Sequence, residues 1–406
     1  MAAVAYSAST LSALVKLTYT SKGVQNVAYN KKHRPLFSRL NKNKSFSGSG
    51  HVIPVIYSDG KGRSATFSTA QATALNSKQV AFSVDTVVNY SDALITRDLI
   101  RRTAKDEGAF VKAMKHAIDS QINNHSNDIE SNLFRDKIGN IGTVSTIASG
   151  VVTLVQAGDV VNFSVGQEVV FAATSASALR DSGASGAITV VNVDAGTFTI
   201  GSTPSGTAAS DLIWTKGDYV SASDVLKISG LQSWIPAADP SSTAFFGVDR
   251  SVDPSRLGGH RVSGSLSDIK GSIYDGCAKL FRHAMGGEMV AYMSPETFRL
   301  LNAELSMDVL RNPSGEGKAG YESIAIISPL GSLECVPAPF CPDGIVFILD
   351  MSSWELLSMG EVPSIIDDDG LMVERLYNGD SFEVRIASDC NLASHAPGNN
   401  CRVDLT

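Results

Sequence analysis

The fold is decided by residues 106–135, DEGAFVKAMKHAIDSQINNHSNDIESNLFR. Apolar residues recur there every three or four positions, which is the spacing of one face of a long helix. At about 1.5 Å per residue this helix would be roughly 45 Å long, a strut against which β-structure can pack. We expect a shorter helix over 92–105 before it, and polar residues such as Glu130 facing water. The apolar face consists of Phe110, Met114, Ile118, Ile122, Ile129 and Leu133.

The composition indicates an ordered protein. The chain has 406 residues, 43% of them hydrophobic and 18% charged, which is typical of two or three folded domains. No run approaches the roughly 18 apolar residues of a membrane-spanning helix, and residues 1–17 lack the basic start of a signal peptide. The cysteines are odd in number and have no C-x-x-C spacing, so we expect buried free thiols in a reducing cytoplasm. They are Cys277, Cys335, Cys341, Cys390 and Cys401.

The charge is unevenly distributed along the chain. Residues 1–58 carry eight basic residues and no acidic one, and because the whole chain carries −7, the remainder carries −15. A basic arm on an acidic body can bind nucleic acid or the acidic surface of a neighbouring copy. Leu36, Phe37, Leu40 and Phe46 interleave with the charges and require burial. We therefore favour contact with a neighbour over a solvated tail, with an extended conformation over 21–45.

A β-hairpin is expected between the arm and the long helix. Residues 51–58 are rich in Val, Ile and Tyr, and the strand pattern returns over 63–69. Between them, Asp59-Gly60-Lys61-Gly62 supplies turn residues and charges. A further strand over 79–90 would lead into the long helix. The charged tip would either contact another molecule or form a solvated turn.

Residues 140–219 differ in composition from their surroundings. They contain two basic and six acidic residues and no cysteine, and Gly, Ser, Thr and Ala punctuate short strands. Strands of this length and spacing predict a small β-barrel or sandwich that folds on its own. The strands are expected over 143–148, 151–155, 168–172, 187–193, 197–200 and 212–215.

The remaining residues mix helices and strands. Helices are expected over 266–284 and from Pro295 onward, where Ser294 would be the N-cap. Strands over 371–377 and 381–387 flank Asn378-Gly379, a strong hairpin signal, and this hairpin would pack against the long helix. Because strands and helices come in separate runs, the fold class is α+β. Further strands are expected over 289–293, 323–327, 332–336 and 345–349.

No catalytic or cofactor motif stands in the context that it requires. Residues 315–320 fit the pattern GxGxxG, but a helix precedes them and a strand follows, which reverses the order in a dinucleotide site. Residues 367–370, DDDG, lack the spaced carboxylates of a calcium loop and are typical of a turn. We therefore expect no enzyme, no metal and no cofactor.

Several stretches resemble the major capsid protein of tailed bacteriophages, the Hong Kong 97-type family. Residues 230–235, 246–251 and 257–259 are similar to the segment that enters the axial domain of many such capsids. Residues 341–344, CPDG, before a strand that ends in Asp350, are similar to its exit. Trp354, Asn391, Leu392, Pro397 and Asn400 also match.

The resemblance implies a Hong Kong 97-type capsid fold with an N-arm, an E-loop, a peripheral domain with a long spine helix, and an axial domain. The inserted small all-β domain would be an accessory that only some relatives carry. In chain order we expect the N-arm over 1–45, the E-loop and adjoining strands over 46–90, the spine helix over 91–137, the inserted domain over 140–219, a connection over 220–264, the axial domain over 265–365 and C-terminal peripheral strands over 366–406.

The function implied by the resemblance is structural. Copies would assemble as pentamers and hexamers into the icosahedral or prolate head around the double-stranded DNA of a tailed phage. Assembly would take place in the cytoplasm of the bacterial host, with a scaffolding protein and a portal as partners, a decoration protein as a further candidate, and no membrane. The alternative is a β-rich phage structural or adhesin-type binding protein without enzymatic activity. That alternative would explain residues 140–219 but would leave the long helix and the basic arm without a role.

Candidate contacts between copies lie in the arm and in the hairpin turn. Both segments carry charges with no evident partner nearby in the sequence. Some relatives join an E-loop lysine to an asparagine of the next subunit, but no acid catalyst can be assigned here, so this rests on analogy alone. The candidate residues are Lys31, Lys32, Arg34, Arg39, Asp59, Lys61 and Arg63.

Overall fold

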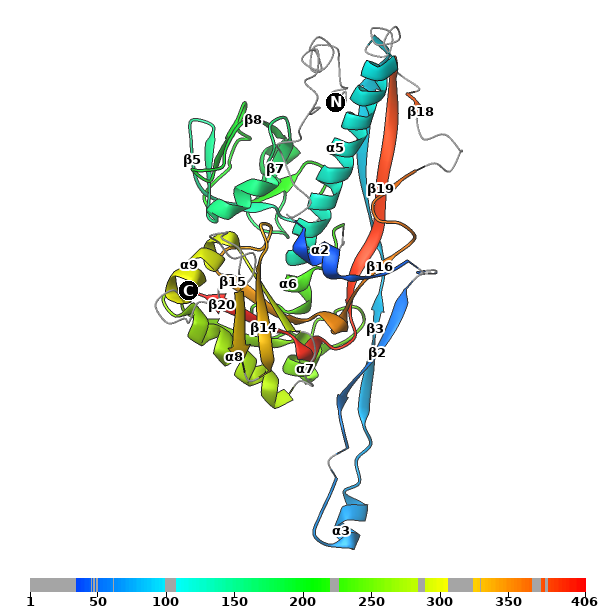
Figure 1. The fold of residues 1–406 in the computed structure, drawn as a ribbon, viewed down its shortest axis with the longest axis vertical. Coiled ribbons are helices and arrows are strands. Elements are labelled where there is room, and N and C mark those ends of the chain that lie inside the picture. The colour runs from blue at the N-terminus through cyan, green and yellow to red at the C-terminus, as the bar shows by residue number, and fades with distance from the viewer. Residues whose placement is uncertain are drawn as a thin grey trace, which may run out of the picture.

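The computed structural model describes residues 34–44, 46, 48, 50–60, 62–98, 107–219, 226–283, 289–305, 324–328, 330–366, 374–376 and 379–406, with side chains of the long helix from residue 117 onward. Figure 1 shows an elongated molecule, with the long helix at one end and a β-hairpin projecting from the other. The barrel lies beside the long helix in the same view. None of the described helices is both long and apolar enough to cross a membrane.

The expected spine helix is α5, Glu107–Phe134. Of the predicted apolar face, Ile129 and Leu133 are buried and Ile118 and Ile122 are half-buried, while the side chains of Phe110 and Met114 lie outside the described ones. The helix predicted over 92–105 is wrong over 92–96. These residues continue strand β4, Val87–Thr96, because ten residues of β4 pair antiparallel with β19, Ser381–Ser394. Pairing with a distant strand overrides the local helical pattern.

Strand β19 organises the first sheet. Its neighbours are β4 and β16, Trp354–Ser358, and β16 in turn pairs in parallel with β1, Asn41–Asn43. The predicted C-terminal hairpin is formed by β18, Glu374–Arg375, and β19, although Asn378 of its turn lies outside the described residues. A short strand, β17, Ser364–Ile365, completes the sheet. Helix α5 packs against β4 and β19, so the predicted C-terminal hairpin packs against the spine helix through β19, as expected.

The second sheet has the order β11-β20-β15-β12-β14-β13. Helices α8, Ile269–His283, and α9, Pro295–Leu305, cover one face of it. Ser294 caps α9, and its Oγ accepts a hydrogen bond of 3.2 Å from the backbone N–H of Thr297. The strands are β11 (His260–Gly264), β12 (Met289–Met293), β13 (Ile324–Ser328), β14 (Gly331–Pro337), β15 (Ile345–Asp350) and β20 (Cys401–Leu405).

Strand β20 corrects the expected boundary after residue 365. It lies between β11 and β15 in the second sheet, and not with β19 in the first. Its side chains Cys401 and Val403 are fully buried in the apolar layer beneath α8. β20 therefore packs where its apolar side chains are buried, in the middle of the second sheet, and not beside β19, its neighbour in sequence.

The six strands expected over 140–219 are all present and form a closed barrel. They follow the order β10-β5-β6-β9-β8-β7. Phe163 and Phe198 stack in its core with ring centroids 4.5 Å apart, and a 3₁₀ turn over Ala157–Asn162 connects β6 to β7. The strands are β5 (Gly142–Ala148), β6 (Val151–Leu154), β7 (Glu168–Ala172), β8 (Gly186–Asn192), β9 (Thr197–Ile200) and β10 (Leu212–Thr215).

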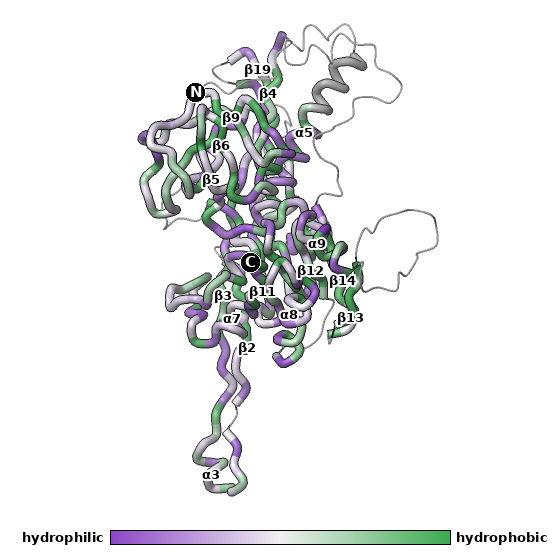
Figure 2. Tube along the Cα trace, turned by 90° about the vertical axis from the view of Figure 1, so that its left-hand side faces the viewer, coloured by the Kyte–Doolittle hydropathy of each residue, from purple (hydrophilic) through white to green (hydrophobic). Residues whose placement is uncertain are grey.

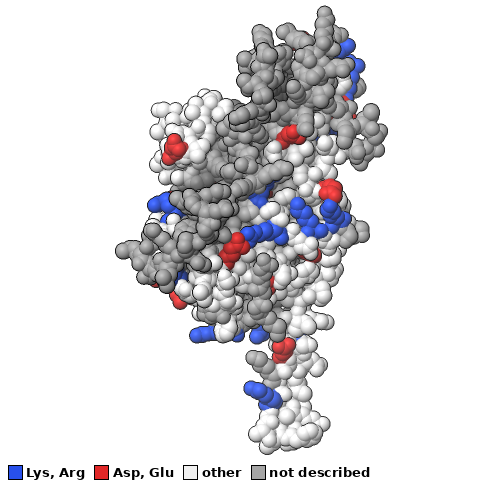
Figure 3. All heavy atoms as spheres, viewed as in Figure 1, with Lys and Arg blue, Asp and Glu red and all other residues white. Residues whose placement is uncertain are grey.

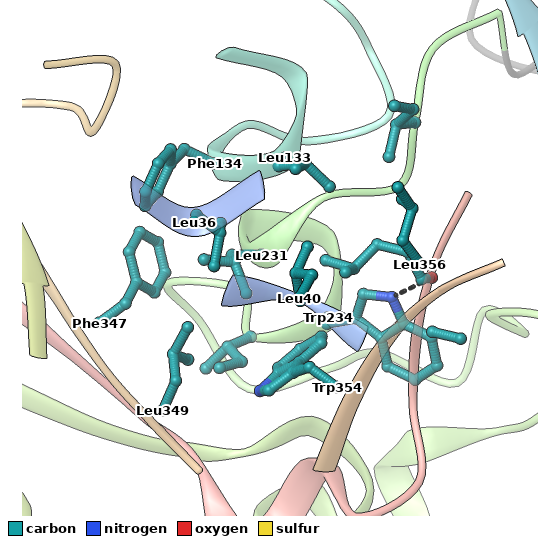
Figure 4. Close-up of a cluster of buried hydrophobic side chains, with 14 of the residues drawn as sticks. Leu36, Leu40, Leu133, Phe134, Leu231, Trp234, Phe347, Leu349, Trp354 and Leu356 are labelled. Atoms are coloured by element: carbon teal, nitrogen blue, oxygen red, sulfur yellow. Dashed lines mark hydrogen bonds between the residues drawn. The ribbon is translucent and has the colours of Figure 1, made fainter. Parts of the chain in front are cut away.

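The largest core lies where α5, the first sheet and the second sheet meet, and Figure 4 shows its side chains. Trp234, at the end of α6 (Leu231–Trp234), packs edge-on against Trp354 with ring centroids 6.1 Å apart. The indole N–H of Trp354 donates to Asn400 Oδ1 at 2.8 Å. Residues that carried the resemblance in the sequence thus meet in one buried cluster.

The basic arm enters this core. Residues Pro35–Arg39 form helix α2, so the extended conformation expected over 21–45 is wrong there, and residues 1–33 lie outside the described ones. Leu36, Phe37, Leu40 and Phe46 are buried within their own chain. The expectation that these four side chains contact a neighbour is therefore wrong, because α5 and the two sheets already supply their burial.

The five cysteines are free and buried, as expected. Burial raises the pKa of Cys335 to about 12, so its thiol stays neutral at physiological pH. The GxGxxG and DDDG segments lie outside the described residues.

Candidate functional site

The projecting hairpin is the candidate site for contact with another molecule. Strands β2, His51–Ser58, and β3, Lys78–Val84, pair antiparallel, and helix α3, Phe67–Ala72, lies at the far end. Figures 1 and 2 show it standing away from the body in two perpendicular views. The return strand predicted over 63–69 is wrong, because the apolar alternation that matches β2 lies in β3 and residues 67–72 are helical.

Near the predicted turn, the outgoing and returning backbones of the hairpin lie very close together. A Cβ atom on Gly60 would lie 1.8 Å from the carbonyl oxygen of Leu75, and one on Gly62 would lie 1.8 Å from that of Thr73. Only glycine allows backbones to approach so closely. The two glycines therefore allow the two backbones of the hairpin to pack closely together. They do not form its turn, because the chain reverses further out, at α3.

Near the body, the hairpin has a buried face and an exposed one. Ile53 and Phe82 belong to the large core and are 1% and 0% exposed. On the opposite face, Val52 and Ile56 are 60% and 62% exposed. Their cross-strand partners are Ser83 and Gln79, and Pro54 pairs with Ala81 between them, so this face carries no charge.

The far end of the hairpin is also apolar and exposed. Phe67 on α3 is 82% exposed and Leu75 is 63% exposed. Figure 3 shows the hairpin with very few charged atoms, in contrast to the body above it. Phe67 and Leu75 thus add to the exposed apolar side chains that the hairpin already carries at Val52 and Ile56. The hairpin therefore has the character of a surface that another molecule covers.

The predicted contact residues on the hairpin are exposed charges. Asp59 and Arg63 both face solvent, and neither forms an ion pair with another described residue. Lys61 lies outside the described residues. Sequence reasoning singled out these charges and missed two exposed apolar residues. Phe67 falls in the strand expected over 63–69, and Leu75 falls in a stretch for which no element was predicted.

The predicted contact residues of the arm are engaged within their own chain. Arg34 Nη2 donates to Asn123 Oδ1 at 3.2 Å, and burial lowers the pKa of Arg34. Arg39 donates to both carboxylate oxygens of Glu334, at 2.7 and 2.9 Å, and these hydrogen bonds raise the pKa of Arg39. Lys31 and Lys32 lie outside the described residues.

Glu130 on α5 is the residue that holds the arm, and sequence reasoning missed it. Its side chain is 0% exposed rather than facing water. Its carboxylate accepts hydrogen bonds from the backbone N–H groups of Leu36, at 3.0 Å, and Phe37, at 2.7 Å. Burial raises the pKa of Glu130 to about 7, against these hydrogen bonds and the nearby charge of Arg34.

Comparison with known proteins gives matches in structure only. No protein-family model matches the chain, and no curated protein matches its sequence. A chain of the cyanophage A-1(L) capsid asymmetric unit is similar to it, with a TM-score of 0.52 at 11% identity over 95% of this chain and 98% of the other. The capsid of an empty GTA particle follows with a TM-score of 0.49 at 8% identity over 99% of both chains. A chain from Gordonia phage Cozz has a TM-score of 0.45 at 9% identity, covering 96% of this chain and 91% of the other.

The cyanophage likeness extends over almost the whole of both chains, so it concerns the complete architecture rather than one shared motif. The chain has the α+β Hong Kong 97-type phage capsid fold that the sequence led us to expect.

Proposed function

We propose that this chain is a structural capsid protein whose copies assemble into the head of a tailed phage. The observation that carries the proposal is the hairpin over 51–84, which leaves the body with one face buried and the other face apolar and exposed. The fold shared with a cyanophage capsid chain supports the same conclusion.

The physical argument concerns what stabilises the outer part of the hairpin. A two-stranded hairpin alone is marginally stable in water, because few side chains cover its faces. Its exposed side chains, Val52, Ile56, Phe67 and Leu75, lose contact with water only when a second molecule covers them. In a shell, a neighbouring copy covers every hairpin, because all copies occupy equivalent or nearly equivalent positions.

The finer features of the proposal follow the expectations from the sequence. Copies form pentamers and hexamers that enclose double-stranded DNA in an icosahedral or prolate head, located in the virion after assembly in the bacterial cytoplasm. A scaffolding protein and a portal take part, and a decoration protein is a further candidate. The role is structural rather than enzymatic.

Electron microscopy of the purified full-length protein tests the proposal, together with light scattering after size-exclusion chromatography. We expect closed shells or pentameric and hexameric rings. A monodisperse monomer at all concentrations would overturn the capsid role, and would favour the β-rich binding protein instead.

A further inference from the structure

A basic cleft lies where α8 meets β11 and α7, Pro254–Gly258. It encloses about 490 Å³, within the range of small-molecule sites. Three of its lining residues carry a positive charge and one carries a negative charge, although the chain after residue 58 is acidic overall. Cations are therefore gathered in this cleft against the overall charge of the body. The lining residues are Asp239, Ser255, His260, Arg261, Lys279 and Arg282.

Arg261 forms a fixed wall of the cleft. Its Nε donates to the carbonyl oxygen of Pro236 at 2.7 Å, and its Nη2 donates to that of Gly258 at 2.9 Å. Its Nη1 donates to the carbonyl oxygen of Gly259 and to the carboxylate of Asp239, both at 3.1 Å. Because every nitrogen of the guanidinium group is engaged, Arg261 supplies charge to the cleft but has little capacity to bond to a ligand. The ion pair with Asp239 offsets part of that charge.

The other two cations, Lys279 and Arg282, are exposed and lie on α8. They are three residues apart, so they lie on the same side of the helix and about 4.5 Å apart along its axis. Lys279 Nζ donates to the backbone carbonyl of Arg261 at 2.7 Å, which holds the ammonium group at the cleft and leaves two of its hydrogens for other acceptors. Within the described chain, neither Lys279 nor Arg282 is paired with an acidic side chain, and Arg282 forms no hydrogen bond there.

Basic residues near the end of a helix are common, because they interact favourably with the helix dipole. Two observations distinguish this pair of cations. Ser255 on α7 is exposed and lines the same cleft, and its hydroxyl bonds to no other residue that the structure describes. Positive charge is also crowded behind the cleft: burial lowers the pKa of Arg261 despite the neighbouring Asp239, and the charge of Arg402 lowers it further. An anion in the cleft would offset this crowding.

The donors of the cleft match the acceptors of a phosphate group. A guanidinium group can donate two parallel N–H bonds to one phosphate, and an ammonium group acts as a point charge. A phosphate group has three strong acceptor oxygens, enough for the Arg282 fork and the Ser255 hydroxyl together. A second, linked phosphate group would offset the charge of Lys279, one helical turn away.

We propose that this basic cleft binds a small anion with two or more linked phosphate groups, with Lys279, Arg282 and Ser255 as its contacts. All three side chains are exposed, so a ligand in the cleft reaches them without any rearrangement of the chain. Arg261 acts behind them through its charge alone. This inference does not depend on the capsid role, because it concerns one copy of the chain.

The test is a titration of the full-length protein with pyrophosphate, measured by calorimetry and phosphorus NMR. We expect saturable binding that weakens as sodium chloride is added, and that is about tenfold or more weaker in Lys279→Gln and in Arg282→Gln. ATP should compete with pyrophosphate, because it carries the same linked phosphate groups. The matched control, Lys270→Gln, removes a positive charge near the other end of α8 and should bind like the wild type.

The melting temperature separates a ligand site from a structural role. Pyrophosphate should raise the melting temperature of the wild type and of Lys270→Gln, but not that of Arg282→Gln. Without pyrophosphate, Arg282→Gln should melt near the wild-type temperature, because Arg282 is exposed, so it decides the question if Lys279→Gln is destabilised.

Three results would overturn the proposal. They are the absence of pyrophosphate binding, an Arg282→Gln protein that binds as tightly as the wild type, and displacement of pyrophosphate by a short DNA duplex. Displacement by DNA would assign the cleft to the backbone of a nucleic acid. Because binding is measured apart from assembly, shells without pyrophosphate binding would leave the capsid proposal intact.

Discussion

The buried carboxylate of Glu130 accepts a hydrogen bond of 2.7 Å from the backbone N–H of Phe37. The two residues are 93 positions apart, and their contact joins the arm to the spine helix. Since burial raises the pKa of Glu130 to about 7, this contact is linked to pH in the physiological range.

We predict that Glu130→Gln flattens the dependence of stability on pH. The pKa of Glu130 is raised from 4.5 to about 7, so the folded chain binds the proton more tightly than the unfolded chain. The stabilisation is complete below about pH 4.5 and is lost as the pH rises through about 7, a change of about 3 kcal/mol. Urea unfolding at pH 5 and pH 8 measures it.

A glutamine in place of Glu130 cannot titrate, so the difference between the two pH values should shrink by that amount. The control is Glu296→Gln, at an exposed carboxylate paired with Arg299. An unchanged slope in Glu130→Gln would show that other groups carry the pH dependence.

We predict that the exposed apolar residues of the hairpin act only in assembly. The double variant Phe67→Ser, Leu75→Ser should keep the melting temperature of the unassembled chain, because both side chains face water there. Shell yield, counted by electron microscopy, should fall strongly. Phe82→Ala is the contrasting variant, since Phe82 packs on Trp234 at 5.2 Å, and its loss should cost about 3–5 kcal/mol in the single chain. Normal shell yield from the double variant would exclude the hairpin tip as a contact.

We predict that two truncations of the arm differ sharply. Removal of residues 1–33 should leave the body folded, because α2 keeps its contacts with Glu130. Removal of residues 1–46 also takes away four buried apolar side chains, at about 1.5–3 kcal/mol each, and should leave a poorly folded chain. Circular dichroism and melting curves compare the two, and equal stability would contradict the docked position of α2.

The barrel is predicted to fold without the rest of the chain. Its six strands close on one another and enclose their own core around Phe163 and Phe198. A fragment of residues 139–219 should therefore melt cooperatively with a β-type circular dichroism spectrum, and Phe198→Ala should lower its melting temperature. The fragment loses the 2.5 Å ion pair between Asp159 and Arg135, which ties the barrel to the end of α5. A random-coil spectrum would show that the barrel depends on that attachment.

Local patterns in the sequence predict the barrel and the helices well. All six barrel strands are short strand-forming segments bounded by turn residues. Ser294-Pro295 is an N-cap followed by proline, which correctly predicts the start of α9. The features that the sequence did not predict depend on partners far along the chain. The ten-residue ladder between β4 and β19 overrides a helical pattern, and Arg39 meets Glu334 across 295 residues.

The sequence predicted a hairpin after residue 51, but not where its chain reverses or which side chains its surface exposes. The glycine-rich segment after β2 indicated a projecting hairpin, and the structure has one there. The charges of Asp59 and Arg63 drew attention because they are recognisable in isolation. Phe67 and Leu75 are exposed because the return strand begins only at residue 78. A strand-like pattern also occurs over 63–69, so the sequence could not show which of the two segments pairs with β2.

The position of β20 has a consequence for the order of events during protein synthesis. His260 of β11 pairs with Cys401 of β20, so the second sheet lacks a central strand until residues 401–405 have left the ribosome. At about 5–20 residues per second, the 141 residues that follow His260, up to and including Cys401, take about 7–28 seconds to translate. During this time the nascent chain carries open edges on β11 and β15. An open sheet edge can pair with other chains, so until β20 is in place the second sheet is a site at which the nascent chain is prone to aggregate.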